Sequence, residues 1–149
     1  MKMSLEDWLS EGYLKNHQTN KNEIAQLFAV FEREIADAQV EAVSAEGRFE
    51  SAYTAGRTMA QASLAASGYR ASGEGNHYWT IQSLAFTLQT DADTINKFDQ
   101  FRRKRNISIY ERIGMISEQE VTEMFELAQE LHKLVTEWLK KNHPNLIGK

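Results

Sequence analysis

The chain has 149 residues, of which 17 are Lys or Arg and 21 are Asp or Glu, and this acidic balance argues against a protein that coats nucleic acid non-specifically. It contains no cysteine, which excludes a disulfide framework and a thiolate metal site. No apolar run approaches the roughly 18 residues of a membrane-spanning helix, and the first residues lack the apolar stretch of a signal peptide. We therefore expect one cytoplasmic domain with no membrane contact.

Apolar residues at helical spacing predict the first three helices. A short helix is expected over about 4–14, followed by an amphipathic helix over 20–42 whose apolar side chains recur at i, i+3, i+4 and i+7. The segment 45–67 repeats this pattern with an apolar face that is rich in alanine. Because small side chains let a neighbouring helix approach closely, we expect the third helix to lie at the centre of the fold.

The middle of the chain is predicted to contain a loop and two further helices. The stretch 68–77, GYRASGEGNH, holds three of the eight glycines and is the clearest loop. A shorter helical stripe follows at 81–88. Thr90, with Asp93 three residues later, predicts the N-cap of a helix over about 91–105.

The last helix, 117–142, has the strongest signals. Ser117 and Glu120 form the pattern of a capping box, and Ile116 and Val121 have the spacing of a hydrophobic staple. Apolar residues then keep the helical period to the end of the segment.

No segment shows sustained period-two alternation, and we therefore predict no strand. The expected fold is all-α, an up-and-down bundle of four to five main helices plus a short N-terminal helix. We expect a single domain over 1–149 with its core in about 20–142.

The predicted helix before the last one is strongly basic. Residues 97–105 carry five basic side chains against one acidic side chain, a net charge of +4. One interpretation is packing, in which Arg102 and Arg105 cover apolar surface with their stems and complement the helix dipole. The other is phosphate recognition, in which the guanidinium of Arg105 donates two hydrogen bonds to phosphate oxygens. Asn106 would be a neutral donor, and the hydroxyl of Tyr110 would lie within reach of the phosphate.

The segment from about 44 to 139 resembles the HEPN superfamily (higher eukaryotes and prokaryotes nucleotide-binding). The resemblance rests on the alanine-rich helix GRFESAYTAGRTMAQASLAASGYR, the loop GEGNHYW, the basic helix ending in FRRKRN, a later tyrosine and the long acidic last helix. It implies a helical bundle that forms a homodimer, in which two copies of the motif face each other and act on RNA without a metal or another cofactor.

The family motif is an arginine, a polar residue and then a histidine four to six positions later. Arg105 and Asn106 match it, but Tyr110 stands where the histidine is expected. In active members the arginine stabilises charge on the phosphate while the histidine moves protons during attack by a ribose 2′-hydroxyl. Tyrosine has an ordinary pKa of about 10, so Tyr110 is expected to donate a proton but not to act as a base. Whether the chain is a metal-independent endoribonuclease is left open, with these three residues as catalytic candidates.

The resemblance also implies a partner. Many such bundles are the toxin-type half of a pair with a minimal nucleotidyltransferase antitoxin, which in some cases attaches AMP to a tyrosine after the arginine motif. Tyr110 is the matching candidate for modification. Candidates for binding RNA phosphates are Arg102, Arg103 and Lys104, together with Arg57 from the alanine-rich helix.

Two alternatives use the same residues differently. The basic helix is the docking surface of a non-catalytic bundle that binds a nucleotide or a protein partner, or the chain is a scaffold with no ligand. His77, after the glycine loop, is interpreted as a helix-start residue exposed to water, with a ligand or partner contact as the other reading. No histidine or carboxylate pair has the spacing of a known metal motif, so we predict no metal site.

Overall fold

The computed structural model describes residues 3–110 and 116–147, and it describes side chains as far as residue 106 on the first of these stretches. The described chain is mainly helical and contains one two-stranded sheet, which confirms the prediction of an all-α bundle. None of its helices is both long enough and apolar enough to cross a bilayer.

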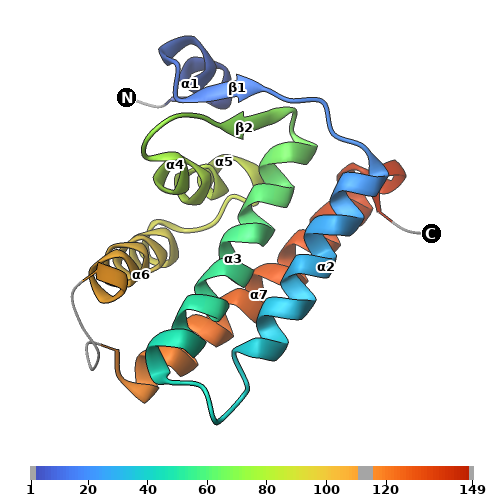
Figure 1. Ribbon diagram of the computed structural model, residues 1–149. Helices are drawn as coiled ribbons and strands as arrows, with labels where there is room; N and C mark the ends of the chain where they lie inside the picture. The colour runs from blue at the N-terminus through green and yellow to red at the C-terminus, as the bar shows by residue number, and fades with distance from the viewer. Residues whose placement is uncertain (1–2, 111–115, 148–149) are drawn as a thin grey trace.

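Three long helices form the main bundle: α2 (Lys21–Asp37), α3 (Ala45–Ala66) and α7 (Glu118–Asn142). In Figure 1 they run side by side, with α3 packed against both of the others. At Gly56 of α3, an added Cβ would lie only 3.1 Å from the Cε of Met124 on α7. The prediction that α3 is the central helix is therefore correct, and its small side chains are the reason α7 can approach it so closely.

A second group of helices covers the side of α3 away from α2. It consists of α4 (Asn76–Gln82), α5 (Leu84–Thr87) and α6 (Ala92–Tyr110), and Figure 1 shows α6 beside the lower half of α3. Phe98 of α6 is fully buried against Tyr53 of α3, with ring centroids 5.8 Å apart. This contact sets the distance between the two helices that carry most of the arginines.

The N-terminal elements form a small separate core at one end of the bundle. Helix α1 (Leu5–Glu11) contributes Trp8, which packs edge-on against two rings. Its ring centroid lies 4.8 Å from that of Trp79 on α4 and 5.0 Å from that of Phe86 on α5. Tyr13 stacks on the same Trp79, with ring centroids 3.9 Å apart. These aromatic contacts fix the start of α4, where His77 lies.

The prediction that the chain contains no strand is wrong. Strands β1 (Leu14–Asn16) and β2 (Tyr69–Ala71) pair in an antiparallel sheet, with Leu14 opposite Ala71. Each strand has three residues, which is too short for an alternating pattern to be visible in a sequence. The predicted loop 68–77 accordingly contains β2 and the first turn of α4.

Several predicted helix limits also need correction. The helix expected over 20–42 ends at Asp37, and the single stripe at 81–88 is part of two short helices, α4 and α5. The helix expected over 91–105 continues to Tyr110, so Arg105 does not lie at its C-terminus. The argument that Arg105 complements a helix dipole is therefore wrong.

The N-cap predicted for this helix is wrong as well. The side chain of Asp91, not that of Thr90, accepts the backbone N–H of Thr94, at 3.3 Å. The hydroxyl of Thr90 is buried without a hydrogen-bond partner among the described residues. Aspartate and threonine are both good N-caps, and the sequence offered the two side by side.

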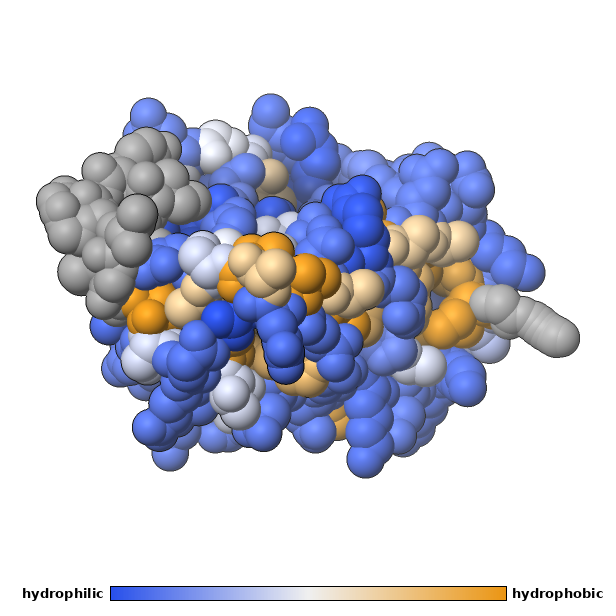
Figure 2. Space-filling model, turned by 60° about the horizontal axis from the view of Figure 1, so that its bottom comes forward, coloured by the Kyte–Doolittle hydropathy of each residue, from blue (hydrophilic) through white to orange (hydrophobic). Residues whose placement is uncertain are grey.

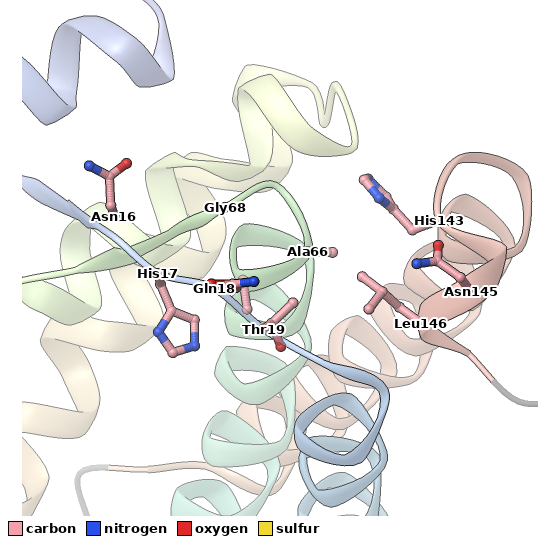
Figure 3. Close-up of a pocket in the computed structure, with 10 residues that line it drawn as sticks. Asn16, His17, Gln18, Thr19, Ala66, Gly68, His143, Asn145 and Leu146 are labelled. Carbon is pink, nitrogen blue, oxygen red and sulfur yellow. The ribbon is translucent and has the colours of Figure 1, made fainter.

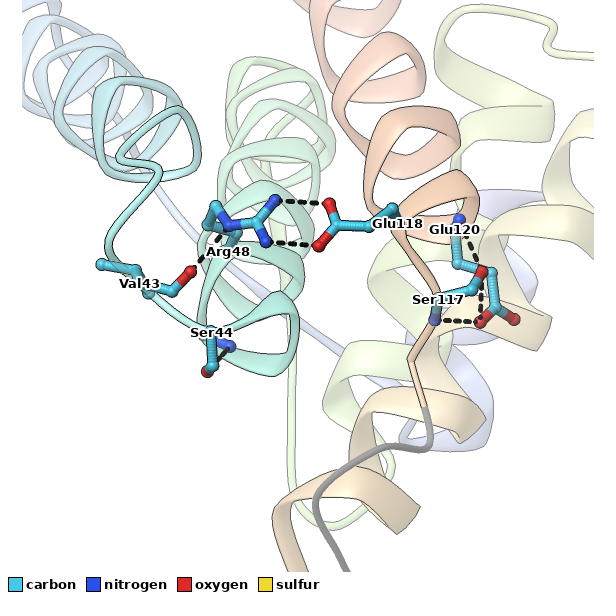
Figure 4. A network of polar contacts seen from close by, with 7 residues as sticks. Val43, Ser44, Arg48, Ser117, Glu118 and Glu120 are labelled. Carbon is cyan, nitrogen blue, oxygen red and sulfur yellow. Dashed lines mark hydrogen bonds and ion pairs between the residues drawn. The ribbon is translucent and has the colours of Figure 1, made fainter.

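The predicted cap of α7 is confirmed. Ser117 and Glu120 form the reciprocal capping box, with the Glu120 backbone N–H 3.1 Å from the Ser117 hydroxyl. Figure 4 shows that the same end of α7 is joined to the start of α3. The guanidinium of Arg48 donates two hydrogen bonds to Glu118, at 2.9 and 2.7 Å, and a third to the carbonyl of Val43.

The end of the bundle near the α2–α3 turn has a mixed surface. Figure 2, which turns the bottom of Figure 1 forward, shows apolar side chains gathered in a band across a mainly hydrophilic face. Val40 and Val43 of the turn are 45% and 39% exposed, and they are the most exposed large apolar residues among those described.

Candidate functional site

Three arginines from two helices gather around one buried tyrosine. Tyr53 of α3 is fully buried, and Arg57 follows it by one helical turn. From α6, the guanidinium carbon of Arg105 lies 5.4 Å from the centre of the Tyr53 ring, and that of Arg102 lies 5.4 Å from the ring of Tyr78. We call Arg57, Arg102 and Arg105 the arginine cluster.

Burial decides the protonation of Tyr53. Removal of the phenol from water raises the pKa of Tyr53 to about 12, and the nearby charges of the arginine cluster offset only part of this effect. The hydroxyl is therefore neutral at any physiological pH and acts as a hydrogen-bonding group.

Arg105 is already paired. Its Nε and one terminal nitrogen donate to the two carboxylate oxygens of Glu50 at 2.6 and 3.0 Å, and the other terminal nitrogen donates to the side-chain oxygen of Asn106 at 3.1 Å. Arg105 and Asn106 thus contact each other, but the guanidinium nitrogens that we assigned to phosphate donate to a carboxylate of α3. Glu50 was not among the predicted site residues, although it lies on the same helical face as Arg57, at i, i+7 spacing.

The other predicted phosphate ligands on α6 are also paired, and they point in different directions. Arg102 and Arg103 both donate to Asp99 on their own helix, and Arg103 remains 58% exposed at its side chain. Lys104 forms an ion pair with Glu120 of α7, at 2.9 Å. Of the basic run, only Arg102 and Arg105 therefore belong to the cluster around Tyr53.

Arg57 is the exception in the cluster. It forms no ion pair with a described carboxylate, and its Nε is buried without a hydrogen-bond partner. Burial lowers the pKa of Arg57, and the positive charge of Arg105 acts in the same direction. The charges of Glu50 and Glu34 offset part of this effect, but neither carboxylate forms an ion pair with the guanidinium in the described structure.

A cavity of about 300 Å³ lies beside Arg57, a volume at the lower end of the range for small-ligand sites. We call it the Arg57 pocket. Its lining residues are Arg57, Gln61, Leu64, Arg70, Ala71, Asn76, His77 and Thr80. Two guanidinium groups, two amides, an imidazole and a hydroxyl therefore face a space large enough for a phosphate and part of a sugar.

His77 joins the pocket to the arginine cluster. Its Nδ1 lies 3.3 Å from the hydroxyl of Tyr53, and the ring is half-buried. Burial, with the positive charges of Arg57 and Arg105 adding to it, lowers the pKa of His77 to about 4. Our interpretation of His77 as an exposed helix-start residue is wrong, because the side chain turns inward to a tyrosine that is 24 residues away in the sequence.

Tyr110 belongs to α6, but its side chain lies outside the described residues. Its assignment as a catalytic or modified residue therefore stays a prediction.

A second cavity of about 460 Å³ lies between the segment before α2, the end of α3 and the C-terminal turn (Figure 3). Its lining residues are Asn16, His17, Gln18, Thr19, Ala65, Ala66, Gly68, His143, Asn145 and Leu146. No arginine or lysine is among these, and His17 is engaged with Glu23 at 2.8 Å. This cavity offers less to a charged ligand than the Arg57 pocket does.

The described residues contain no group of three or more histidine, aspartate or glutamate side chains that could hold a metal ion. Comparison of the chain with protein-family models, with curated proteins and with solved structures gave no match. The resemblance to the HEPN superfamily therefore stays a prediction, and the argument for function depends on the arginine cluster and its pocket.

Proposed function

We propose that this protein is a HEPN-like, toxin-type protein that binds RNA phosphates at the arginine cluster and cleaves RNA without a metal ion. The observation that carries the proposal is Arg57, whose Nε is buried beside the pocket without a hydrogen-bond partner and which has no anion in ion-pair contact among the described residues. A phosphodiester in the pocket would supply this anion together with acceptor oxygens for the guanidinium.

The rest of the pocket suits the sugar–phosphate backbone of RNA. Arg70 offers a second guanidinium, and the amides of Gln61 and Asn76 can donate to and accept from ribose hydroxyls. Contacts of this kind position a strand without reading its bases. We therefore expect affinity for RNA of many sequences, limited to the few phosphates that the pocket can reach.

Arg105 contributes to the proposal indirectly. Its pairing with Glu50 means that a phosphate can contact Arg105 only if it replaces the carboxylate. Arg105 is 20% exposed at its side chain and Glu50 is 36% exposed, so this exchange needs no opening of the core.

The expected partners complete the proposal. A homodimer would bring two arginine clusters into one assembly, and a nucleotidyltransferase antitoxin would silence the protein by attaching AMP to Tyr110. A cytoplasmic site of action, where RNA and ATP are both present, is part of the same proposal. An added AMP would be visible in the intact mass of the protein co-expressed with such a partner.

A second candidate is a non-catalytic bundle that binds a nucleotide or a protein partner. It is favoured by the pairing of Arg102 and Arg105 with carboxylates, which leaves Arg57 as the one guanidinium of the cluster that is ready for an anion. In that case the pocket binds a phosphate but breaks no bond.

One experiment tests the proposed function. The purified chain is incubated in EDTA with a fluorescent single-stranded RNA, and binding and cleavage are measured for the wild type, Arg57→Gln and a control, Arg33→Gln. Arg33 lies on α2, is 63% exposed at its side chain and forms an ion pair with its neighbour Glu34. We expect Arg57→Gln to lose affinity at least about tenfold, while the control binds as the wild type does.

Cleavage products that end in a 2′,3′-cyclic phosphate would support the ribonuclease, and binding without cleavage would favour the second candidate. Equal RNA binding by the wild type and Arg57→Gln would refute the assignment of the pocket.

A further inference from the structure

The strongest feature that the proposed function does not yet use is the pair formed by His77 and Tyr53. The imidazole comes from the first turn of α4, and the phenol comes from the middle of α3. Gly75, directly before α4, has a φ of +78°, a conformation that an L-residue rarely adopts. This turn directs the chain from the surface back to α3 and thereby brings the histidine beside Tyr53.

The hydrogen bond to Tyr53 determines which ring nitrogen of His77 is available. Nδ1 faces the phenol at 3.3 Å, so Nε2 is the nitrogen left for a ligand. His77 also lines the Arg57 pocket, where the phosphate of the proposed function would bind. One imidazole nitrogen is therefore held by the protein, as in catalytic histidines that a neighbouring group orients.

We propose that His77 is the proton-transfer residue of the RNA cleavage, in place of the histidine that the resemblance would have put at position 110. This inference rests on the proposed function and names a catalytic group for it. It also removes the main objection to catalysis, which was that tyrosine is a poor base near neutral pH.

The charged surroundings of His77 suit this role. Tyr53 of α3 contacts the imidazole directly. The charges of Arg57 and Glu50 on α3, and of Arg102 and Arg105 on α6, act on it electrostatically. Before RNA binds, burial and the arginine charges keep the imidazole neutral, so it can accept a proton. A bound phosphodiester offsets the arginine charges and favours the protonated ring, so the basicity of His77 rises when the substrate is present.

The reaction needs no further reactant. The ribose 2′-oxygen attacks the adjacent phosphorus, the new O–P bond forms, and the bond from phosphorus to the 5′-oxygen of the next nucleotide breaks. The 2′-hydroxyl proton passes to His77 and from there to the departing 5′-oxygen. The products are a 2′,3′-cyclic phosphate and a 5′-hydroxyl, while Arg57 stabilises the charge on the non-bridging oxygens.

The test compares binding with cleavage in the full chain. We measure the single-turnover cleavage rate and the RNA affinity of the wild type, His77→Asn and a control, His143→Asn, whose histidine lines the other cavity. His77→Asn should cleave about 100-fold more slowly or worse, as expected when a general base is removed. Its RNA affinity should change by less than about threefold, because the arginines remain.

A third variant separates chemistry from folding. His77→Ala leaves a space beside Tyr53, and added imidazole should restore part of its cleavage rate without changing its RNA affinity. An RNA with a 2′-deoxy residue at the cleavage site should bind to the wild type but stay intact.

The outcomes distinguish this inference from the function on which it depends. If the wild type does not bind RNA, the proposed function fails and the inference fails with it. If the wild type cleaves and His77→Asn cleaves equally fast, the function stands and the role of His77 is overturned. Binding by the wild type without cleavage also overturns the role of His77, while the phosphate-binding pocket stands.

Discussion

Replacing Arg57 by methionine should stabilise the folded protein and abolish its RNA binding. Methionine has nearly the length of the arginine stem and can keep its packing on α3, but it carries no charge. The change removes a guanidinium whose Nε is buried without a partner and whose pKa is lowered by burial. Most substitutions in a protein interior are destabilising, so a stabilising result would be diagnostic.

The size of the effect follows from two costs that the wild type bears. A buried donor without a partner costs about 1–3 kcal/mol, and exchange of buried charges for apolar groups of similar volume is often worth about 1–4 kcal/mol. Arg57 as a residue is only partly buried, so the full cost of a buried charge does not apply. We therefore expect the free energy of unfolding to rise by about 1–2 kcal/mol, which for a chain of 149 residues raises the melting midpoint by roughly 2–8 °C.

The assay is urea unfolding, followed by circular dichroism in a buffer without phosphate. Wild-type protein, Arg57→Met and Arg33→Met are compared with and without a short RNA. The exposed control should stay within about 0.5 kcal/mol of the wild type. RNA should stabilise the wild type and the control by mass action, and it should leave Arg57→Met unchanged.

If Arg57→Met lowers the free energy of unfolding by more than about 1 kcal/mol, the reasoning is refuted, because such a loss is expected when one member of a buried charge pair is removed. Arg57 would then have a structural role, and the argument for an anion in the pocket would lose its main support.

Three other predictions test separate contacts. Glu50→Gln should raise RNA affinity several-fold in fluorescence anisotropy, because it releases Arg105 and removes a negative charge that competes with phosphate; unchanged or weaker binding would show that Glu50 does not compete. Gly56→Ala should destabilise by about 1–3 kcal/mol in urea unfolding, because the new methyl group would lie 3.1 Å from Met124; a neutral result would mean that Met124 can move aside. The pKa of His77 is about 4 in the folded protein against an ordinary 6.5, so the unfolded chain binds more protons between these two pH values. The free energy of unfolding therefore falls as the pH is lowered from about 6.5 to about 4. His77→Asn should lose less stability than the wild type when unfolding is compared at pH 7 and about pH 4.5; equal losses would contradict the lowered pKa.

The parts of the fold that the sequence predicts well are those with local signals. The capping box at the start of α7 involves residues three apart, and the apolar period of α7 repeats along one helix. The central position of α3 follows from its alanines, because the size of a side chain limits how close another helix can come. Such features need no knowledge of which segments meet in space.

Features that depend on tertiary contacts were missed. The helix predicted over about 91–105 continues to Tyr110, although Asn106 and the isoleucines that follow it have low helix propensity. The strands β1 and β2 are three residues each and are defined by their pairing, across more than 50 residues of sequence. Local propensity is a weak guide wherever packing or pairing with a distant segment decides the conformation.

The same limit explains the candidate site. Arg57, Arg102 and Arg105 could be predicted as site residues because their charge is visible in the sequence itself. Glu50 was missed and His77 was misread, since their partners lie 55 and 24 residues away. No periodicity in the chain reports contacts of this kind.

The pairing pattern within the arginine cluster indicates how the site selects its ligand. Three guanidinium groups near one tyrosine would repel one another, and Glu50 and Asp99 reduce this repulsion by holding Arg105 and Arg102. They leave Arg57 beside the pocket without an ion pair to a described carboxylate. A single anion therefore gains most at that one position, which suits one phosphodiester held in a defined place and not a broad basic surface. This arrangement shows how a chain that is acidic overall can still concentrate positive charge beside one pocket.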